Sequence, residues 1–492
     1  MPEKKNIEWT YAASCGELEL SVNISKPEKS LRDIADASGA DKESCSLCWD
    51  ENELLPGRFE ATSSKVEPML LNGKPALVAE GIKEVTGMSF AAQESLNYDP
   101  QKPRYYFAMD GMPWRLHYSP YRYFQEHCIV STQSHIPMHI DKNTFDRLLY
   151  LIDCFPGYFF GSNADLPIVG GSILSHEHYQ GGKHVFALMK APVSRTIRLP
   201  EAFKGVFAGV VSWPCAVIRL CAADKEALAD AASFILDKWQ SYDDEDAQIF
   251  SHGCGNEGLE GMPAELREQA QASLKEDGTY GLDFEGIPHN CVTPIAYKAS
   301  FVAKGQRGYV VDIVLRNNFA VRKRPWGIFH VDEPYHHIKK ENIGLIEIMG
   351  KAILPGRLSF ELPMCEDAIA RAYVKKEDPQ AFEWKLVEVR PTAVHARWAK
   401  QILEDMYEHG LPEGFDIKEE KEDLLEAESD FEKKVGAAIR FEDNRTKEEA
   451  FSSFMQNEVG GIYERILACC DVFRYADNRE EALNRFIATL NE

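Results

Sequence analysis

Hydrophobic and polar residues alternate along the first part of the chain. The run Leu18-Glu-Leu-Ser-Val-Asn-Ile24 has an apolar side chain at every second position, which is the period of a strand with one buried face. This pattern predicts β structure over residues 7–30. Charged and small residues predict a short helix over 26–41, whereas the Gly- and Pro-containing stretch 58–103 has weak periodicity and is predicted as loops and short elements.

The middle of the chain has the sharpest periodicity. β-branched and apolar residues predict three strands, at 114–120, 127–132 and 158–161. Apolar residues recur at helical spacing over 142–155, which predicts an amphipathic helix with Asp141 or Asn143 as its N-cap. A polar, glycine-rich loop is then predicted at 162–172, followed by a histidine-rich strand at about 175–187.

The second half again mixes the two kinds of element. Its patterns predict helices at 226–240 and 341–353, strands at 309–315 and 328–330, and an inserted loop with a helix at 251–275. From residue 379 to the last residue helical periodicity dominates, and the acidic, lysine-rich stretch 418–434 predicts a solvated helix face. The order of the elements predicts an α+β protein.

Composition and charge exclude several classes of function. The chain has 492 residues, 44% of them hydrophobic, which is typical of a globular protein. Its 55 Lys and Arg against 78 Asp and Glu give a net charge of -23, which disfavours duplex nucleic acid and anionic membranes as main partners. The apolar run at 205–218 contains Pro214 and is too short to span a bilayer, so it is predicted as core. No apolar stretch follows the first lysines, and we expect a cytoplasmic protein.

The most informative segment is 175–182, Ser-His-Glu-His-Tyr-Gln-Gly-Gly. Residues two apart on a strand share a face, so His176, His178 and Gln180 are predicted to project together, while the intervening Glu and Tyr point the other way. A partly exposed polar strand face is the alternative interpretation. The preceding loop weakens that alternative, since Asn163 and the run Gly170-Gly171-Ser172 offer backbone amides and small side chains that let phosphate oxygens approach closely.

A histidine beside such a loop can act as a nucleophile toward phosphorus. Neutral imidazole attacks near pH 7 without help from a neighbouring base, and the product is a phosphoramidate. Gln180 neither accepts nor delivers a proton, but its amide can donate a hydrogen bond to a phosphoryl oxygen. A histidine nucleophile beside a glutamine, with no general acid, suits a leaving group that is itself a phosphate, because a phosphate departs without a strong acid. The two residues therefore predict a substrate with a diphosphate bond.

Cys45 and Cys48 form a Cys-x-x-Cys pair, which supplies half of a tetrahedral zinc site. A chance pair and a redox pair are the alternatives, and the acidic residues that follow disfavour a redox pair because they raise a thiol pKa. His135 and His176 lie next to predicted strands of one sheet and could complete a Cys2His2 site. The metal would then be structural and His178 would remain available for chemistry.

Motifs from most of the chain match one known family. They are Cys45-Ser-Leu-Cys48, Glu126-His-Cys-Ile-Val, the segment 161–182, Leu315-Arg-Asn-Asn and His336-His-Ile-Lys-Lys-Glu-Asn-Ile-Gly-Leu-Ile-Glu. In these the chain resembles the type II galactose-1-phosphate uridylyltransferases, also called UDP-glucose–hexose-1-phosphate uridylyltransferases, of the histidine-triad-like superfamily. The resemblance implies two half-barrel modules of mainly antiparallel sheet with packed helices and a helical C-terminal region. We expect these modules over residues 1–240 and 241–492.

The resemblance also implies an activity in galactose metabolism and a set of site residues. The activity is ping-pong transfer of UMP between UDP-glucose and galactose 1-phosphate, in which His178 becomes uridylylated and Gln180 assists. The implied zinc ligands are Cys45, Cys48, His135 and His176. The expected substrate contacts are Arg58, Asn163, Gly170, Gly171, Ser172, Ser175 and Lys340. A homodimer is expected, with Lys340 reaching substrate from the second half or from a partner subunit.

The chain departs from the family pattern at several points. Asp332 stands where a second histidine often follows the residue that matches His330, so a second metal near His330, His336 and His337 is left open. A helical segment that commonly precedes the first strand is expected to be missing, and stretches 59–105 and 251–280 look longer than usual.

Two rival functions are a nucleotide hydrolase or phosphorylase of the same superfamily and a non-catalytic, zinc-stabilised nucleotide-sugar binding protein. The preferred hexose 1-phosphate does not follow from the sequence.

Overall fold

The structure is a computed structural model, and it divides the chain into two compact units. It describes residues 6–24, 45, 47–48, 70–71, 74–75, 89–90, 104–110, 112–170, 173–252, 288–302, 306–319, 329–415 and 452–491. Unit 1 comprises Met1–Glu28, Asp332–Lys340 and Gly350–Ile466, and unit 2 comprises Lys29–Val331, Glu341–Met349 and Leu467–Glu492. The expected pair of modules with a boundary at residue 240 stays a prediction.

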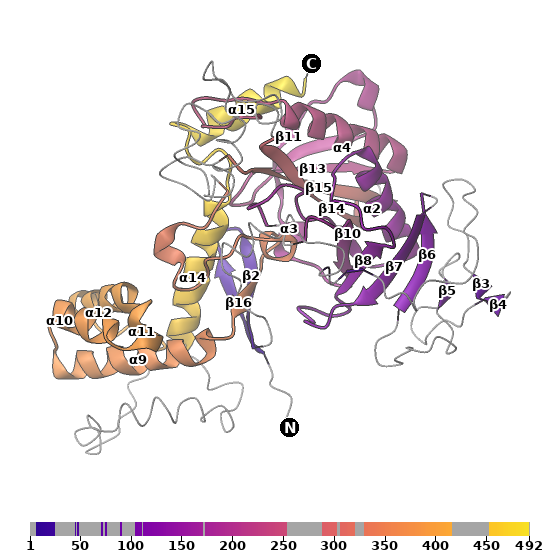
Figure 1. Ribbon diagram of the computed structural model, residues 1–492. Coiled ribbons are helices and arrows are strands. Elements are labelled where there is room, and N and C mark those ends of the chain that lie inside the picture. The colour runs from indigo at the N-terminus through magenta and orange to yellow at the C-terminus, as the bar shows by residue number, and fades with distance from the viewer. Residues whose placement is uncertain are drawn as a thin grey trace, which may run out of the picture. The chain divides into compact units, whose positions relative to one another are not determined.

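Unit 2 is built on one antiparallel sheet (Figure 1). Within the described residues its strands lie in the order β11 (Val193–Ile197), β12 (Phe207–Val211), β13 (Val217–Ala222), β15 (Gln306–Asn317), β14 (Asn290–Val302), β9 (Phe159–Gly161), β10 (His178–Gly182), β8 (Cys128–Thr132), β7 (Met112–Tyr118), β6 (Arg104–Met109) and β5 (Ser89–Phe90). β14 pairs with β9 on one side and β15 on the other. The short strands β3 (Leu70–Leu71) and β4 (Lys74–Pro75) pair separately.

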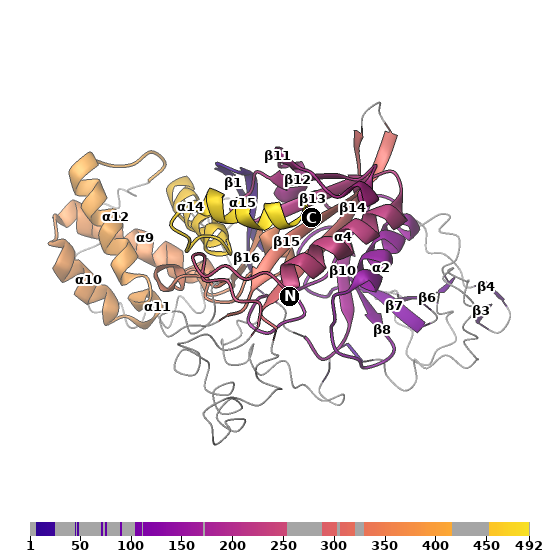
Figure 2. The same ribbon diagram turned by 90° about the horizontal axis from the view of Figure 1, so that it is seen from above.

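Two amphipathic helices cover this sheet, as Figure 1 and Figure 2 show. The predicted helix over 142–155 is α2 (Lys142–Cys154), and its N-cap is Asp141, whose side chain accepts a hydrogen bond from the amide of Thr144. The predicted helix over 226–240 is α4 (Lys225–Gln240), capped by Asp224. α2 packs on β9 and β14, and α4 packs on β13, β14 and β15. The other helical segments among the described residues of unit 2 are α3 (Ala187–Lys190), η4 (Glu201–Phe203), α8 (Leu345–Ile348) and α15 (Arg479–Thr489).

Unit 1 combines a small sheet with helices. β1 (Ile7–Ala13) pairs antiparallel with β2 (Gly16–Asn23), and β16 (Lys351–Pro355) pairs parallel with β2. Its helical segments are η5 (Glu333–Tyr335), α9 (Leu358–Lys375), α10 (Pro379–Val387), α11 (Arg390–Ala393), α12 (Ala396–His409) and α14 (Ser453–Cys469), the last continuing past this unit at its C-terminal end. Ile369, Phe382 and Leu403 lie in the apolar core of its helices. None of the described helices is long and apolar enough to cross a membrane.

The predicted α+β class, the antiparallel sheet and the helical C-terminal region are confirmed. The β structure predicted over 7–30 is the β1–β2 hairpin. The run predicted as core at 205–218 contributes β12 and the start of β13, and most of its residues from Ala208 onward are buried.

Three predicted elements are wrong in extent or type. The helix predicted over 341–353 is only the short α8, because the chain turns at Gly350, with a φ of +104°, and then pairs with β2 as β16. The strand predicted over 175–187 is limited to β10, since Gly182 ends it and α3 follows. Residues 329–330, part of a predicted strand, form a bend. The elements predicted at 26–41, 253–275 and 418–434, and most of 58–103, lie outside the described residues.

Candidate functional site

His178 begins β10, and one of its ring nitrogens is held by the backbone. Nδ1 lies 2.8 Å from the carbonyl oxygen of His176. A carbonyl oxygen only accepts hydrogen bonds, so Nδ1 carries the proton and the lone pair is on Nε2. Burial lowers the pKa of His178, although the bond to the carbonyl opposes this, and the ring is therefore neutral near pH 7. The strand thus presents a neutral imidazole whose Nε2 can act as a nucleophile.

Gln180 lies two residues further along β10 and is oriented by a histidine that the sequence patterns did not single out. Nε2 of His127 lies 3.1 Å from Oε1 of Gln180. Nδ1 of His127 is buried without a hydrogen-bond partner among the described residues. An orphaned lone pair is less costly than an orphaned N–H, so the proton is on Nε2 and is donated to Gln180. The amide NH2 of Gln180 then points away from His127 and can donate to a phosphoryl oxygen.

His127 stays neutral in this position. Burial lowers the pKa of His127 to about 4, against the raising effect of the hydrogen bond to Gln180. Its ring packs between Tyr123, at a centroid distance of 5.2 Å, and Phe124, at 4.7 Å. In the sequence it begins the strand predicted at 127–132 and belongs to the motif Glu126-His-Cys-Ile-Val; in the structure it precedes β8.

The opposite face of the same strand is anchored to α2. Nη1 of Arg147 lies 2.5 Å from the carboxylate of Glu177, and the hydroxyl of Tyr179 donates to that carboxylate at 2.8 Å. The Tyr179 ring stacks on Trp114 with centroids 5.4 Å apart. The prediction that these two residues point away from the face of His178 and Gln180 is therefore confirmed.

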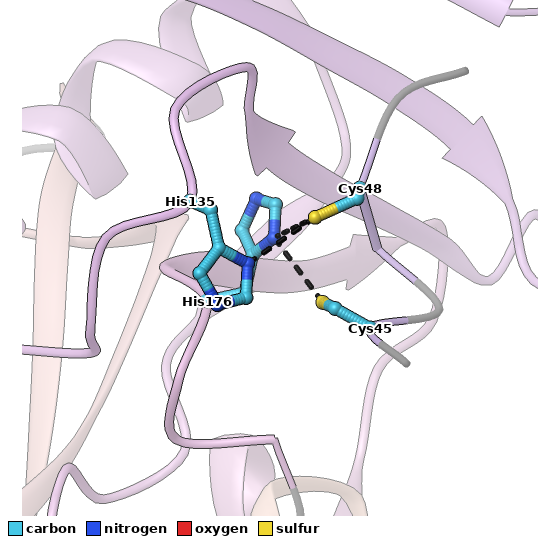
Figure 3. Close-up of side chains that lie close together, drawn as sticks. All are labelled: Cys45, Cys48, His135 and His176. Atoms are coloured by element: carbon cyan, nitrogen blue, oxygen red, sulfur yellow. Dashed lines mark hydrogen bonds between the residues drawn. The ribbon is translucent and has the colours of Figure 1, made fainter. Parts of the chain in front are cut away.

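Four predicted ligands meet beside β8 and β10 (Figure 3). Sγ of Cys48 lies 3.2 Å from Nδ1 of His135 and 3.6 Å from Nδ1 of His176. Sγ of Cys45 lies 3.4 Å from the same nitrogen of His176. All four ligand atoms lie within 4.8 Å of one another, and the described part of the chain contains no second group of this kind. The sequence-predicted set is thus brought together as one group that could hold a metal ion.

The geometry of this group fits a tetrahedral metal site. Zinc bonds of about 2.3 Å to sulfur and about 2.0 Å to nitrogen place these ligand atoms about 3.5 Å apart. Nε2 of His176 donates to the carbonyl oxygen of Thr132 at 2.8 Å, which leaves the lone pair on Nδ1, the atom that faces the two sulfurs (Figure 3). A metal-binding histidine is ordinarily held by its other nitrogen in this way.

The loop after β9 holds part of the predicted phosphate cradle. Oδ1 of Asn163 accepts a hydrogen bond from the amide of Leu345 at 2.9 Å, which fixes the direction of the Asn163 side chain. Gly170 has a φ of +102°, in the left-handed region that favours glycine. The hydroxyl of Ser175 is buried and has no partner among the described residues. A bound anion would satisfy this hydroxyl, whose burial alone is unfavourable.

Four other predicted substrate contacts are Arg58, Gly171, Ser172 and Lys340. Arg58, Gly171 and Ser172 lie outside the described residues. Lys340 belongs to unit 1, whereas His178 belongs to unit 2. The assignment of these four residues to substrate binding stays a prediction.

The histidines considered for a second metal make other contacts. Nδ1 of His330 lies 2.7 Å from Oδ1 of Asn342. Nδ1 of His337 lies 2.9 Å from Nδ1 of His395, whose Nε2 lies 3.0 Å from the carboxylate of Glu361. His330, His336 and His337 join no group of three or more metal-type ligands within the described residues.

Known proteins resemble the chain over nearly its full length. The sequence model described as "Galactose-1-phosphate uridyl transferase, C-terminal domain" matches residues 151–377. A galactose-1-phosphate uridylyltransferase of Caldanaerobacter subterraneus subsp. tengcongensis is 33% identical over 485 residues, which cover 99% of this chain and 73% of the relative. The protein of that name from Pediococcus pentosaceus is 35% identical over 490 residues, covering 99% and 74%. The one from Clostridium acetobutylicum is 37% identical over 421 residues, covering 85% and 68%. No solved structure matches the chain.

Proposed function

The chain belongs to the galactose-1-phosphate uridylyltransferase family, and we propose that it transfers a uridylyl group from UDP-glucose to galactose 1-phosphate through a covalent intermediate on His178. The observation that carries this proposal is the hydrogen bond from Nδ1 of His178 to the carbonyl of His176. It leaves Nε2 as the atom with the lone pair, on a ring that burial keeps neutral.

In the first half-reaction, Nε2 of His178 attacks the α-phosphorus of UDP-glucose. A P–N bond forms, and the bond from that phosphorus to the bridging oxygen breaks. Glucose 1-phosphate leaves with the electron pair of the broken bond, and as a phosphate it needs no proton from a general acid. The NH2 group of Gln180, turned outward by the bond from His127, donates to a phosphoryl oxygen as charge develops there.

In the second half-reaction, a phosphate oxygen of galactose 1-phosphate attacks the same phosphorus. The P–O bond of UDP-galactose forms, the P–N bond breaks, and His178 recovers its lone pair on Nε2. The bond from Nδ1 to the carbonyl of His176 persists through both steps, so the ring returns to the same tautomer. Positioning and charge stabilisation supply most of the rate in such transfers.

We propose zinc as the metal of the Cys45, Cys48, His135 and His176 group, because two sulfur and two nitrogen donors are a usual zinc set. A closed set of four protein ligands leaves no open position, so a bound zinc ion would act as a structural cross-link. His176 would hold the start of β10 in place, two residues before His178. We also expect a homodimer, which sedimentation velocity would test, and a cytoplasmic location.

The experiment that tests the function is exchange of labelled glucose 1-phosphate into UDP-glucose, without galactose 1-phosphate. Wild-type protein should catalyse this exchange, because the first half-reaction is reversible. His178→Ala should abolish exchange while it keeps the bound metal, since its side chain is not one of the four ligands. His139→Ala is a matched control, because that side chain is 74% exposed and contacts Asp165 instead.

The outcomes separate the rival functions. UDP-glucose consumption that needs no hexose 1-phosphate would indicate a hydrolase. Binding of UDP-glucose with neither exchange nor a covalent adduct would indicate a non-catalytic binding protein. Exchange that survives in His178→Ala would contradict the assignment of the nucleophile.

A further inference from the structure

Arg316, near the end of β15, is a fully buried arginine that forms no ion pair within the described residues. Its Nη1 donates to the carbonyl oxygen of Val169 and, at 2.9 Å, to that of Ile343. The guanidinium lies 4.5 Å from the centroid of the Phe329 ring. Nε and Nη2 are buried, and the described residues offer them no acceptor. An arginine keeps its charge even when burial lowers its pKa. Among the described residues the Glu347 carboxylate raises that pKa electrostatically but forms no ion pair with Arg316.

A second buried arginine in the same sheet shows the usual solution. Arg219 of β13 donates from Nε and Nη2 to the two carboxylate oxygens of Asp312 at 2.7 and 2.8 Å. Its other donors reach the carbonyl oxygens of Leu188 and Ala191. Arg219 is therefore paired and satisfied, whereas in the described part of the chain Arg316 has no ion pair and its Nε and Nη2 have no acceptor. Burial of an unpaired charge is unfavourable for folding, so stability alone does not account for Arg316.

The contacts of Arg316 join the two ends of the loop at residues 163–170. At one end it holds Val169 directly, next to Gly170. The other end, Asn163, is reached through a second segment of chain. Arg316 holds the carbonyl oxygen of Ile343, and two residues further along that segment the amide of Leu345 donates to Oδ1 of Asn163. The packing is close: a Cβ atom added to Gly170 would lie 2.3 Å from both Nη1 of Arg316 and the carbonyl oxygen of Ile343. One guanidinium thus sets the shape of this loop.

We propose that Arg316 is a positioning residue for uridylyl transfer. Its Nη1, through the carbonyl oxygens of Val169 and Ile343, holds Gly170 and Asn163 in the geometry that accepts the diphosphate of a nucleotide sugar, and its positive charge favours that anion. The inference rests on the proposed function, since it assigns the diphosphate to the loop at residues 163–170. The inference adds to the proposed site a residue, Arg316, that touches no substrate and acts through the backbone carbonyls of Val169 and Ile343.

Arg316→Lys separates the geometry from the charge, because lysine keeps the charge but is shorter and lacks the planar NH2 group whose two hydrogens reach the carbonyls of Val169 and Ile343. Single-turnover formation of the uridylyl-enzyme from UDP-glucose should slow by about 100-fold, as small displacements near a reacting group do, with the metal retained. Arg219→Lys is the matched control: it should lower the melting temperature without a comparable loss of rate.

Binding of UDP reports on the charge separately. UDP should raise the melting temperature of the wild type and, to a smaller extent, of Arg316→Lys, but not of Arg316→Met. Arg219→Lys should respond as the wild type does. If Arg316→Lys does not fold, Phe329→Leu removes the ring that supports the guanidinium, and it should slow the single turnover less strongly.

Several results would overturn the inference. They are a wild-type single-turnover rate in Arg316→Lys, a wild-type rate in Phe329→Leu, and a wild-type response of Arg316→Met to UDP. A wild-type protein that forms no uridylyl-enzyme would instead contradict the proposed function. The UDP response would still test the role of Arg316 in that case.

Discussion

His176 and His178 lie two residues apart, and each leaves a different ring nitrogen without a proton. In each case a backbone carbonyl determines which nitrogen this is. Thr132 accepts from Nε2 of His176, so Nδ1 faces the thiols. The carbonyl of His176 accepts from Nδ1 of His178, so Nε2 keeps its lone pair. Residue type alone does not distinguish a metal ligand from a nucleophile, since each imidazole offers both nitrogens. Here the hydrogen bond at the far nitrogen makes the distinction.

His127→Phe should slow formation of the uridylyl-enzyme by about 100-fold, the lower end of the cost of losing one donor to a developing charge. The phenyl ring preserves the packing between Tyr123 and Phe124 but cannot donate to Gln180, whose amide would then rotate freely. Single-turnover kinetics at saturating UDP-glucose would measure the effect. Gln180→Ala combined with His127→Phe should be no slower than Gln180→Ala alone, and additive losses would contradict the positioning role.

The same substitution gives a prediction about pH. Burial lowers the pKa of His127 to about 4 in the folded protein, against about 6.5 in an unfolded chain. As the pH falls, the unfolded state therefore binds the extra proton before the folded state does. The contribution of His127 to the unfolding free energy is complete above pH 6.5 and is lost as the pH falls toward 4. Over that range the wild type should lose up to about 3 kcal/mol of unfolding free energy relative to His127→Phe.

Urea unfolding at several pH values would measure this difference. His409→Asn is a suitable control, because the His409 side chain is 71% exposed, and its stability curve should run parallel to that of the wild type. Parallel curves for His127→Phe and the wild type would contradict the prediction. Metal release at low pH affects both proteins alike and cancels in the comparison.

At the scale of elements, β10 has a reactive face and an anchored face. The pleat sends His178 and Gln180 to one side and Glu177 and Tyr179 to the other. On the anchored side, Arg147 of α2 joins the Glu177 carboxylate and also pairs with Asp110. His178 is thus held from behind by a buried ion pair and an aromatic stack.

Arg147→Met should destabilise the protein by about 3–5 kcal/mol, because it leaves Glu177 buried without a cation. Burial already raises the pKa of Glu177, and Arg147 opposes that rise. Lys142→Met on the same helix is the matched control, since its pairs with Asp146 and Asp230 are exposed, and it should cost less than about 1 kcal/mol. Urea unfolding would measure both. Equal losses would contradict the importance of the buried pair, and Glu177→Gln should restore part of the loss in Arg147→Met.

Elements with local causes were predictable, and elements with distant partners were not. α2 follows from its apolar spacing and from the cap at Asp141, both within one stretch of chain. The predicted helix over 341–353 failed because Ala352 pairs with Leu20, more than 300 positions away. A buried strand such as β16 has a continuous apolar run that periodicity cannot separate from a short helix.

At the scale of the whole molecule, the group of Cys45, Cys48, His135 and His176 brings together segments of unit 2 that are distant in the sequence. Cys45 and Cys48 precede the sheet strands in sequence, whereas His135 follows β8 and His176 precedes β10. A metal that binds only the folded form raises the free energy of unfolding, and the increase grows with the logarithm of the ratio of metal concentration to dissociation constant. Its removal should therefore loosen the strands that carry the ligands.

Chelation should make the amides of β8 and β10 exchange about 100-fold faster, when metal at 100 times its dissociation constant is removed. Hydrogen exchange with mass spectrometry would resolve these strands, and the amides of α12 in unit 1 serve as the internal control. Cys48→Ser should reproduce the effect without a chelator. Cys15→Ser, which changes a thiol outside the group, should keep the metal. Unchanged exchange in β8 and β10 after verified metal loss would contradict a structural role.

The sequence by itself determined the mixture of helices and strands, the helices α2 and α4, the Cys45 and Cys48 pair and the alternation of His178 with Glu177. These follow from local periodicity and from the spacing of the two cysteines, which do not depend on where the chain goes next. The family resemblance added His135 and His176 as ligands, and the structure brings all four together. Only the tertiary structure decided which nitrogen of each histidine is available, that His127 orients Gln180, and that Nε and Nη2 of Arg316 have no acceptor among the described residues. Each of these depends on groups that are far apart in the chain or on backbone carbonyls, and residue identity does not encode the directions of their hydrogen bonds.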